Sequence, residues 1–319
     1  MASDIASLDS SPLGREKVAG KVLTPGQLIW RRFLKHRMAV FGMIGFTLLL
    51  LFIIIGSLFI TEERANAVDL QARLSPPTSQ YIMGTDSTGR DIFSRIIYGG
   101  QISLIVGITA VTISVTLGTL VGGLAGFFGG WVDTILMRIT EAMLSIPQLF
   151  LLIVLGKFIG RDIETVNILG KQISGSVMIV IFVIGLTSWM GLSRIVRANV
   201  LSLKEMDYVS VSKSLGSSQI RTFFKHLIPN TIGVIIVSST LGLAGAILSE
   251  AYVSFLGLGI QPPTASWGNM LTAAQTFVQK GSWWMWVFPS TFIVLTILCV
   301  NLIGDGLRDA FDPRSNRHL

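Results

Sequence analysis

Side chains able to do covalent or metal chemistry are few in this sequence, and their spacing does not assemble a catalytic set. The only histidines are His36, His226 and His318, and none lies deep in an apolar segment. This placement excludes a His-Glu-x-x-His metalloprotease and argues against a Ser/His membrane protease. The single cysteine, Cys299, can form no internal disulfide. We therefore expect no catalytic residue, no metal site and no enzyme activity of this chain by itself.

Two acidic residues, Glu141 and Glu250, lie inside or near apolar segments. A carboxylate at mid-bilayer costs roughly 2.5–3.5 kcal/mol on insertion scales, so each must face protein or water. One interpretation makes Glu141 and Glu250 polar points on a substrate path or in a proton relay, and adds Ser254 as a further candidate for the translocation path. The alternative pairs Glu141 with Arg138 one helical turn away and lets Glu250 bond neighbouring backbone. The sequence leaves both interpretations open.

The elements that must position these residues are apolar segments long enough to cross a bilayer. Half of the 319 residues are hydrophobic, and a spanning helix needs about 20 apolar residues. One such segment, residues 134–155, carries two charged residues, Arg138 and Glu141, and five more carry none. The sequence thus predicts an all-α integral membrane protein with six transmembrane helices. The other five segments carry no Lys, Arg, Asp or Glu and span residues 39–60, 96–132, 172–193, 226–249 and 281–304.

The basic residues indicate how the chain is oriented. If the N-terminus is cytoplasmic, 17 of the 25 Lys and Arg fall on the cytoplasmic side, Arg138 included, and eight fall in the other three connections. This is the positive-inside pattern, so the net charge of +7 reflects topology and not nucleic-acid binding. We expect both termini to be cytoplasmic. Residues 1–20 have no apolar core and are not predicted to be a signal peptide.

A polar segment, "KEMDYVSVSKSLGSSQIRTFFKHLIPN" at residues 204–230, interrupts the apolar sequence on the cytoplasmic side. Gly216 can end a first helix, and Ser217 or Ser218 can cap a second one. The first helix is too short to be stable alone in water, so it needs a partner surface. It is predicted over residues 206–215, with one apolar face formed by Tyr208, Val211 and Leu215.

Small residues recur at every fourth position of the second span. Such a stripe lets another helix backbone approach closely, either within the bundle or at an interface with another subunit. Its members are Ala110, Ser114, Gly118, Gly122, Gly126 and Gly130.

The longest polar connection, residues 61–100, is predicted to be extracytoplasmic. Its glycines and Asp, Ser and Thr residues favour turns, and no Gly-x4-Gly-Lys-Ser/Thr phosphate loop occurs in it. We single out one motif there, formed by Gly84, Asp86, Gly89, Arg90 and Asp91.

Four stretches together carry a resemblance to a known family. The polar segment resembles the "EAA–Gly–Leu-Pro" loop of ABC importer permeases, with Ser210 to Ser212 at the EAA positions and Gly216 at the glycine. "HLIPN" at 226–230 stands where that family tends to have "HILPN". At Ser210 the family pattern often has Glu. The longer matches are "GTDSTGRDIFSRIIYGGQISLIVG" (84–107), "SFLGLGIQPPTASWG" (254–268) and "GDGLRDAFDPR" (304–314), and all resemble the C-type permease subunit of dipeptide and oligopeptide importers.

The resemblance implies a type I ABC importer permease fold and a transport role. The helix at 206–215 would sit in a cleft of a separate cytoplasmic ATPase and tilt the spans that it joins when that ATPase closes on ATP. No cofactor is expected on this chain, and ATP and Mg would bind the partner subunits. The implied ATPase-coupling residues are Glu205, Asp207, Tyr208, Ser210, Val211, Ser212, Leu215, Gly216 and Pro229.

The resemblance also implies partners and a location. The partners are a second homologous permease subunit, two cytoplasmic ABC ATPase subunits, an extracytoplasmic solute-binding protein and the lipid bilayer, with no nucleic acid. The location is a prokaryotic cell membrane, crossed several times. The expected organisation is a cytoplasmic tail with an interfacial amphipathic helix (1–38), a first transmembrane helix (39–60), an extracytoplasmic segment (61–100), a five-helix core (101–310) that includes a coupling loop (204–226), and a cytoplasmic tail (311–319).

Three alternatives remain beside import of short peptides. Similar permeases carry nickel complexes or oligosaccharides, and no residue in these spans decides among the cargoes. A secondary carrier driven by an ion gradient would show internal repeats and more spans. An intramembrane enzyme is disfavoured by the missing histidines.

Overall fold

The computed structural model describes residues 24–147, 149–151, 153–154, 166–168 and 171–312, and this part of the chain is nearly all helical. Two short strands pair as one antiparallel hairpin, with Val166 opposite Ile173. In chain order the elements are α1 (Pro25–Lys35), α2 (Arg37–Phe59), α3 (Glu62–Asn66), η1 (Leu70–Ala72), α4 (Ile92–Phe128), α5 (Gly130–Leu144), β1 (Val166–Ile168), β2 (Lys171–Ile173), α7 (Gly175–Lys204), α8 (Asp207–Ser214), α9 (Gln219–Thr222), the π-turn η2 (Phe223–Leu227), α10 (Ile228–Phe255), α11 (Trp267–Ala274), η3 (Val278–Lys280) and α12 (Trp284–Phe311).

Five of the described helices are long and apolar enough to cross a membrane: α2, α4, α7, α12 and the continuous helix Gln219–Phe255 that α9, η2 and α10 form together. The predicted all-α membrane class is confirmed, and each of these five helices covers most of a predicted apolar segment. The sixth predicted span, residues 134–155, coincides in part with α5, which has 15 residues. The rest of that span includes positions 148, 152 and 155, which lie outside the described residues.

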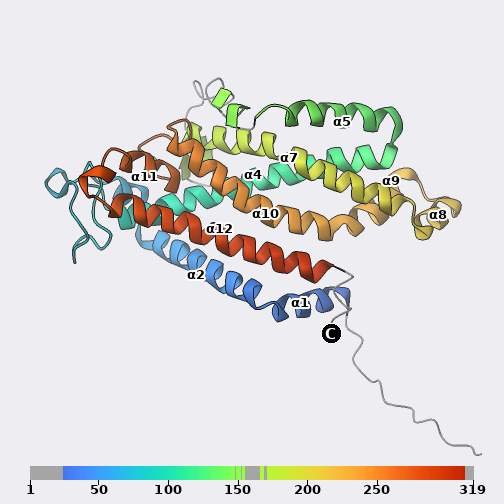
Figure 1. The fold of residues 1–319 in the computed structure, drawn as a ribbon, viewed down its shortest axis with the longest axis horizontal. Helices are drawn as coiled ribbons and strands as arrows, with labels where there is room; N and C mark the ends of the chain where they lie inside the picture. Colours follow the sequence, from blue (N-terminus) through green and yellow to red (C-terminus); the bar gives the residue numbers. More distant parts are fainter. Residues whose placement is uncertain (1–23, 148, 152, 155–165, 169–170, 313–319) are drawn as a thin grey trace, which may run out of the picture.

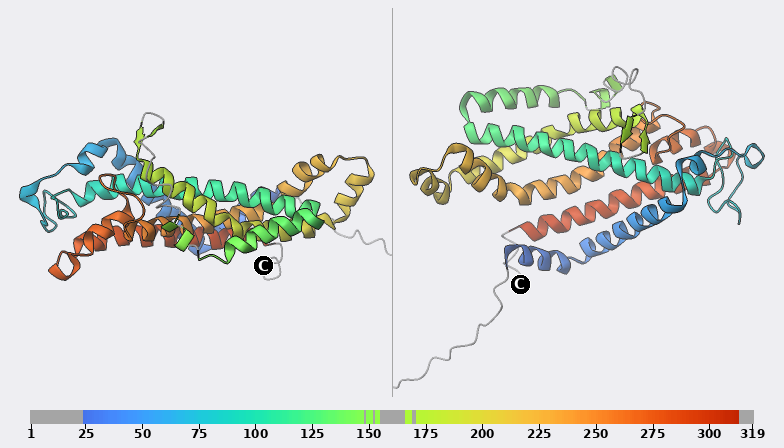
Figure 2. Two further views of the ribbon diagram at one scale, coloured as in Figure 1. Left: turned by 90° about the horizontal axis from the view of Figure 1, so that it is seen from above. Right: turned by 180° about the vertical axis from the view of Figure 1, so that it is seen from behind.

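The long helices lie roughly along one direction and form a flat bundle (Figures 1 and 2). α2 packs beside α12 at one edge, α12 contacts α10, and α10 contacts both α4 and α7 in the centre. α5 lies at the opposite edge, against α4 and α7. We call the end that carries α8 and the last turn of α12 the α8 end, and the end that carries α11 and residues 61–91 the α11 end (Figure 1).

Local sequence signals explain where several helices begin. The Thr24 and Gln27 side chains form a reciprocal capping box at the start of α1. Asp91 caps α4 by accepting the backbone N–H groups of Phe93 and Ser94. A second capping box joins Ser266 to Asn269 and begins α11 at Trp267. Each signal needs only residues a few positions apart.

Candidate functional site

The polar segment leaves the bundle at the α8 end as a helix–turn–helix (Figures 1 and 2). α8 runs from Asp207 to Ser214. Gly216 then adopts a φ of +80°, the left-handed conformation that glycine takes without strain. The Ser218 hydroxyl caps the next helix by accepting the Arg221 N–H, so Ser218 and not Ser217 is the capping residue. Pro229 follows the π-helical turn η2 directly and is the second residue of α10.

α8 is held to the bundle by one side and exposes the other. Val209 is fully buried and packs in a cluster with Phe223 and Leu227. The predicted face points away from this contact, because Tyr208, Val211 and Leu215 are 41%, 56% and 82% exposed. The anchor Val209 is a residue that the sequence analysis missed, since the i, i+3, i+7 pattern selects the opposite face.

Most of the polar residues of this segment are exposed as well. Glu205, Asp207 and Ser210 are exposed, Ser212 is half-buried, and Gly216 is exposed at the tip. Lys204, at the end of α7, donates from its Nζ to the Phe127 carbonyl at 2.8 Å and so ties the base of the segment to α4. The segment can therefore present both apolar and acidic groups to a partner at the α8 end.

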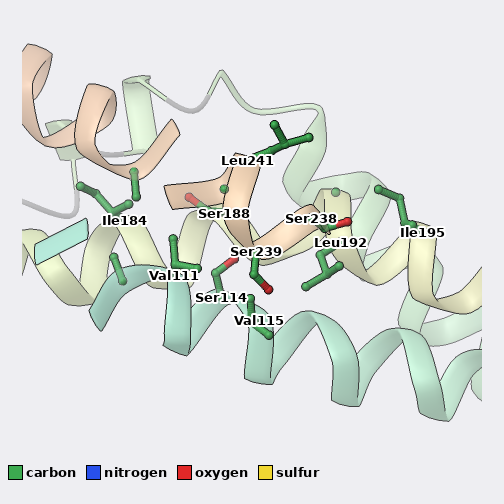
Figure 3. A pocket seen from close by; sticks show the side chains of 14 residues that line it. Val111, Ser114, Val115, Ile184, Ser188, Leu192, Ile195, Ser238, Ser239 and Leu241 are labelled. Carbon is green, nitrogen blue, oxygen red and sulfur yellow. The ribbon is translucent and has the colours of Figure 1, made fainter. Parts of the chain in front are cut away.

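A cavity of about 280 Å³ lies between α4, α7 and α10 (Figure 3). Most of its wall is apolar, and its polar groups are the hydroxyls of Ser114, Ser188, Ser238 and Ser239. Ser239 also donates to the Ile235 carbonyl of its own helix, at 2.6 Å. The wall therefore offers hydroxyl groups and apolar side chains, and it carries no ionisable residue.

A second, larger cavity of about 630 Å³ lies between α5 and α7. It shares Gly191 and Ile195 of α7 with the serine-lined cavity, so the two are contiguous along that helix. Its charged members are Glu141, Arg194 and Arg197. Arg197 makes a two-pronged ion pair with Asp133, of which the Nη2–Oδ2 contact is 2.6 Å.

Glu141 takes part in the ion pair that its spacing to Arg138 suggested. The Arg138 Nη1 and Glu141 Oε2 atoms are 3.7 Å apart, and the two side chains are 80% and 61% exposed. Glu141 also lines the larger cavity between α5 and α7, where its charge is open to the surroundings of the bundle. The pairing and a place on a path are therefore compatible for Glu141.

Glu250 and Ser254 line neither of these two cavities. Glu250 is 0% exposed and Ser254 is 1% exposed. The Ser254 hydroxyl donates to Glu250 at 2.8 Å, and the Ser103 hydroxyl of α4 donates to it at the same distance. Glu250 is thus held by side chains of two helices, not by neighbouring backbone.

The small-residue stripe packs α4 against α7. A methyl group added at Gly118, Gly122 or Gly126 would lie 2.9, 2.2 or 2.8 Å from a carbonyl oxygen of α7. Ala110 and Ser114 lie further along the same helix, where they border the serine-lined cavity. Gly130 departs from the predicted stripe, because it starts α5 with a φ of +53° and no described atom lies within 4 Å of its added methyl position.

The motif at residues 84–91 forms a compact turn ahead of α4, at the α11 end. Asp86 is 5% exposed and accepts four hydrogen bonds, two from Thr88 and two from Arg90, at 2.7–3.0 Å. Gly84 and Gly89 have φ of +75° and +84°. The indole of Trp284 in α12 donates to the Thr85 carbonyl at 3.0 Å and fixes the turn to the bundle.

Ahead of α4, the pKa values of two groups, Asp86 and Tyr81, are shifted from their ordinary values. Burial raises the pKa of Asp86, but the hydrogen bonds from Thr88 and the charge of Arg90 outweigh it, so this pKa lies below its ordinary value. The phenol of Tyr81 donates to Asp69 at 3.0 Å, and this bond raises the pKa of Tyr81. Both shifts favour an ionised Asp86 and a neutral Tyr81 at neutral pH, which are the states that form these hydrogen bonds.

The helices and cavities define a multi-pass membrane protein that contains a mainly apolar cavity with a few hydroxyl groups and displays a helix–turn–helix at one end. The chain belongs to the family of inner membrane components of binding-protein-dependent transport systems, whose model matches residues 118–317. A second model, the N-terminal transmembrane domain of oligopeptide transport permease C, matches residues 24–77. The predicted family is therefore confirmed.

Named relatives cover most of the chain. The dipeptide transport system permease protein DppC of Bacillus subtilis is 40% identical over 90% of this chain and 85% of its own length. The oligopeptide transport system permease protein OppC of Haemophilus influenzae is 38% identical over 91% of this chain and 90% of its own length. The crystal structure of an amino acid ABC transporter aligns with 67% of this chain and 93% of that chain, with a TM-score of 0.47 and 17% identity.

Proposed function

We propose that this chain is the permease subunit of an ATP-driven importer, and that its cargo is a short peptide. It forms half of the translocation path together with a second, homologous permease. A pair of cytoplasmic ATPases binds ATP and Mg, and an extracytoplasmic solute-binding protein delivers the peptide. Support for the cargo comes from the names of the relatives, both of which are peptide permeases.

The observation that carries the proposal is the exposed face of α8. Tyr208, Val211 and Leu215 present apolar surface beyond the end of the bundle, while Val209 holds the helix in place. An exposed apolar patch with acidic neighbours is typical of a protein-binding surface. We infer that it enters a cleft of the ATPase, which puts the α8 end and both termini in the cytoplasm.

The path is inferred to run along α7, from the serine-lined cavity to the larger one. The lining of serine hydroxyls and apolar side chains can contact peptides of different sequence without binding any of them tightly, which suits a passage. Glu141 and Arg194 at the larger cavity offer both signs of charge to a solute that carries both. The second permease would close the open side of this groove.

The test is co-purification of ATPase subunits with a Val211→Glu variant. Val211 is 56% exposed, so a charge there leaves the fold intact. Burying that charge in a cleft of the ATPase is costly, so we expect the ATPases no longer to co-purify and peptide uptake to stop. Val68→Glu is the matched control for ATPase co-purification, because Val68 is 58% exposed and lies at the α11 end, away from α8. Retention of the ATPases and of peptide uptake by Val211→Glu would refute the docking role of α8.

A further inference from the structure

Glu250 is the centre of a buried hydrogen-bond network near the α11 end of α10. Its side chain is fully buried, and the carboxyl group is hydrogen-bonded to the hydroxyls of Ser103, Ser254 and Ser266. Ser103 of α4 donates to Oε2 at 2.8 Å, and Ser254 of α10 donates to Oε1 at 2.8 Å. The carboxyl group therefore joins two helices through two separate hydroxyl groups.

Ser103 and Ser254 each also accept a backbone N–H from the connection between α10 and α11. The Ile260 N–H donates to the Ser254 hydroxyl oxygen at 3.1 Å, and the Trp267 N–H donates to that of Ser103 at 3.3 Å. A hydroxyl has a single hydrogen, which each serine gives to Glu250. Each serine therefore links one backbone N–H of the connection to the carboxyl group. Through these two links, Glu250 holds both ends of residues 260–267.

The same connection is packed closely against both helices. A methyl group added at Gly268 would lie 2.7 Å from the Ala251 backbone of α10, and one added at Gly99 would lie 3.2 Å from Ser266. The Trp267 side chain is fully buried, and its indole donates to the Ile96 carbonyl of α4 at 3.0 Å. The start of α11 therefore has little room to move independently of α10 and α4.

The helix that carries Glu250 is also the helix that emerges from the polar segment. α9, η2 and α10 form one continuous helix, Gln219–Phe255. At 1.5 Å per residue, Glu250 lies about 46 Å along this helix from its start beside α8. The two ends of one long helix thus hold the proposed ATPase contact and the network at α11 (Figure 1).

We propose that Glu250 is a positioning residue that transmits movement of α10 to the start of α11, at the surface that faces the solute-binding protein. This inference rests on the proposed function, because α10 moves only if an ATPase engages α8. Glu250 does not contact the cargo. It acts through Ser103 and Ser254, which keep residues 260–267 attached to the bundle as α10 tilts.

The experiment reports the position of the α11 end with a single cysteine. Val278 follows α11 and is 48% exposed, whereas the only native cysteine, Cys299, is buried. In a Val278→Cys, Cys299→Ser background of the complete transporter in liposomes, a membrane-impermeant maleimide labels position 278. We expect the labelling rate to change when ATP and vanadate trap the ATPases, and this change to be lost in Glu250→Ala.

Milder and matched variants make the result specific. Ser103→Ala and Ser254→Ala each remove one of the two serine links to Glu250. Each is expected to reduce the ATP-dependent change in the labelling rate. Ser57→Ala is the control, because the Ser57 hydroxyl donates to the Ile54 carbonyl of its own helix, α2, at 2.7 Å and borders neither cavity, and this variant is expected to keep the full change. If Glu250→Ala does not fold, the two serine variants carry the test.

Two results would contradict different statements. A full ATP-dependent change in Glu250→Ala, or in both serine variants, overturns the positioning role. Failure of the unmodified chain to purify with any ATPase overturns the proposed function instead, and it does so whatever residue 250 is. ATPase assembly in Glu250→Ala is expected to match that of the parent, because the network lies at the other end of α10.

Discussion

Gly122→Ala places a methyl group between the two most closely packed helices of the bundle. The added carbon would lie 2.2 Å from the Ser193 carbonyl oxygen and 2.9 Å from the Ser193 carbonyl carbon of α7. Both atoms belong to the backbone, so rotation of a side chain cannot relieve the overlap. α4 and α7 must separate by about 0.8 Å at this level to restore a contact of 3.0 Å.

The size of the effect follows from the neighbours of Gly122. Gly118 and Gly126, one turn away on each side, also lie against α7 carbonyl oxygens. Separation at Gly122 therefore loosens three turns of packing, and extra carbon in a well-packed interior costs about 1–3 kcal/mol. Membrane helices have little hydrophobic drive to associate, so lost van der Waals contact is not recovered elsewhere.

The assay is equilibrium unfolding of the purified protein in mixed micelles, titrated with a denaturing detergent. We expect Gly122→Ala to lower the free energy of unfolding by about 1–3 kcal/mol. Gly245→Ala is the matched control, because no described atom lies within 4 Å of its added methyl group, and we expect no loss. Equal stability of the two variants would show that the close approach of α4 to α7 is not a feature of the folded protein.

Two further predictions concern the turn ahead of α4. The lowered pKa of Asp86 means that its carboxylate stabilises the fold above its ordinary pKa, and that this contribution is lost as pH falls through the folded value. Asp86→Asn is expected to lower the free energy of unfolding by about 1.5–3 kcal/mol at pH 7. It is also expected to flatten the fall of that free energy at acidic pH, and an unchanged fall would contradict the prediction. Trp284→Phe, which leaves the Thr85 carbonyl without its indole donor, is expected to cost about 1–3 kcal/mol in thermal unfolding. Trp286 is 40% exposed, and Trp286→Phe is expected to leave the stability almost unchanged. Equal losses in Trp284→Phe and Trp286→Phe would argue against a stabilising hydrogen bond from Trp284 to Thr85.

Elements that depend on short-range signals could be predicted from the sequence. The apolar segments gave five of the described long helices, because the length of an uncharged run is a property of the local chain. The turn at Gly216 and the ion pair between Arg138 and Glu141 also follow from neighbours within a few positions. The helix–turn–helix of the polar segment was predictable for the same reason.

Features that depend on long-range packing could not be predicted in this way. The role of Glu250 is decided by Ser103, which is 147 positions away in the sequence and has no signal that pairs the two. Val209 became the buried residue of α8 because Phe223 and Leu227 fold back onto it. The contiguous cavities exist because α7 borders α4, α10 and α5 at once.

The sequence by itself determined that this chain crosses a membrane, which family it resembles and where its polar segment begins and ends. Those properties reside in hydrophobic length, turn residues and caps, which act between near neighbours. Only the tertiary structure decided that the carboxyl group of Glu250 is buried and joined to Ser103 of another helix. The reason is physical, because burial and hydrogen-bond partners are set by which helices come to lie side by side.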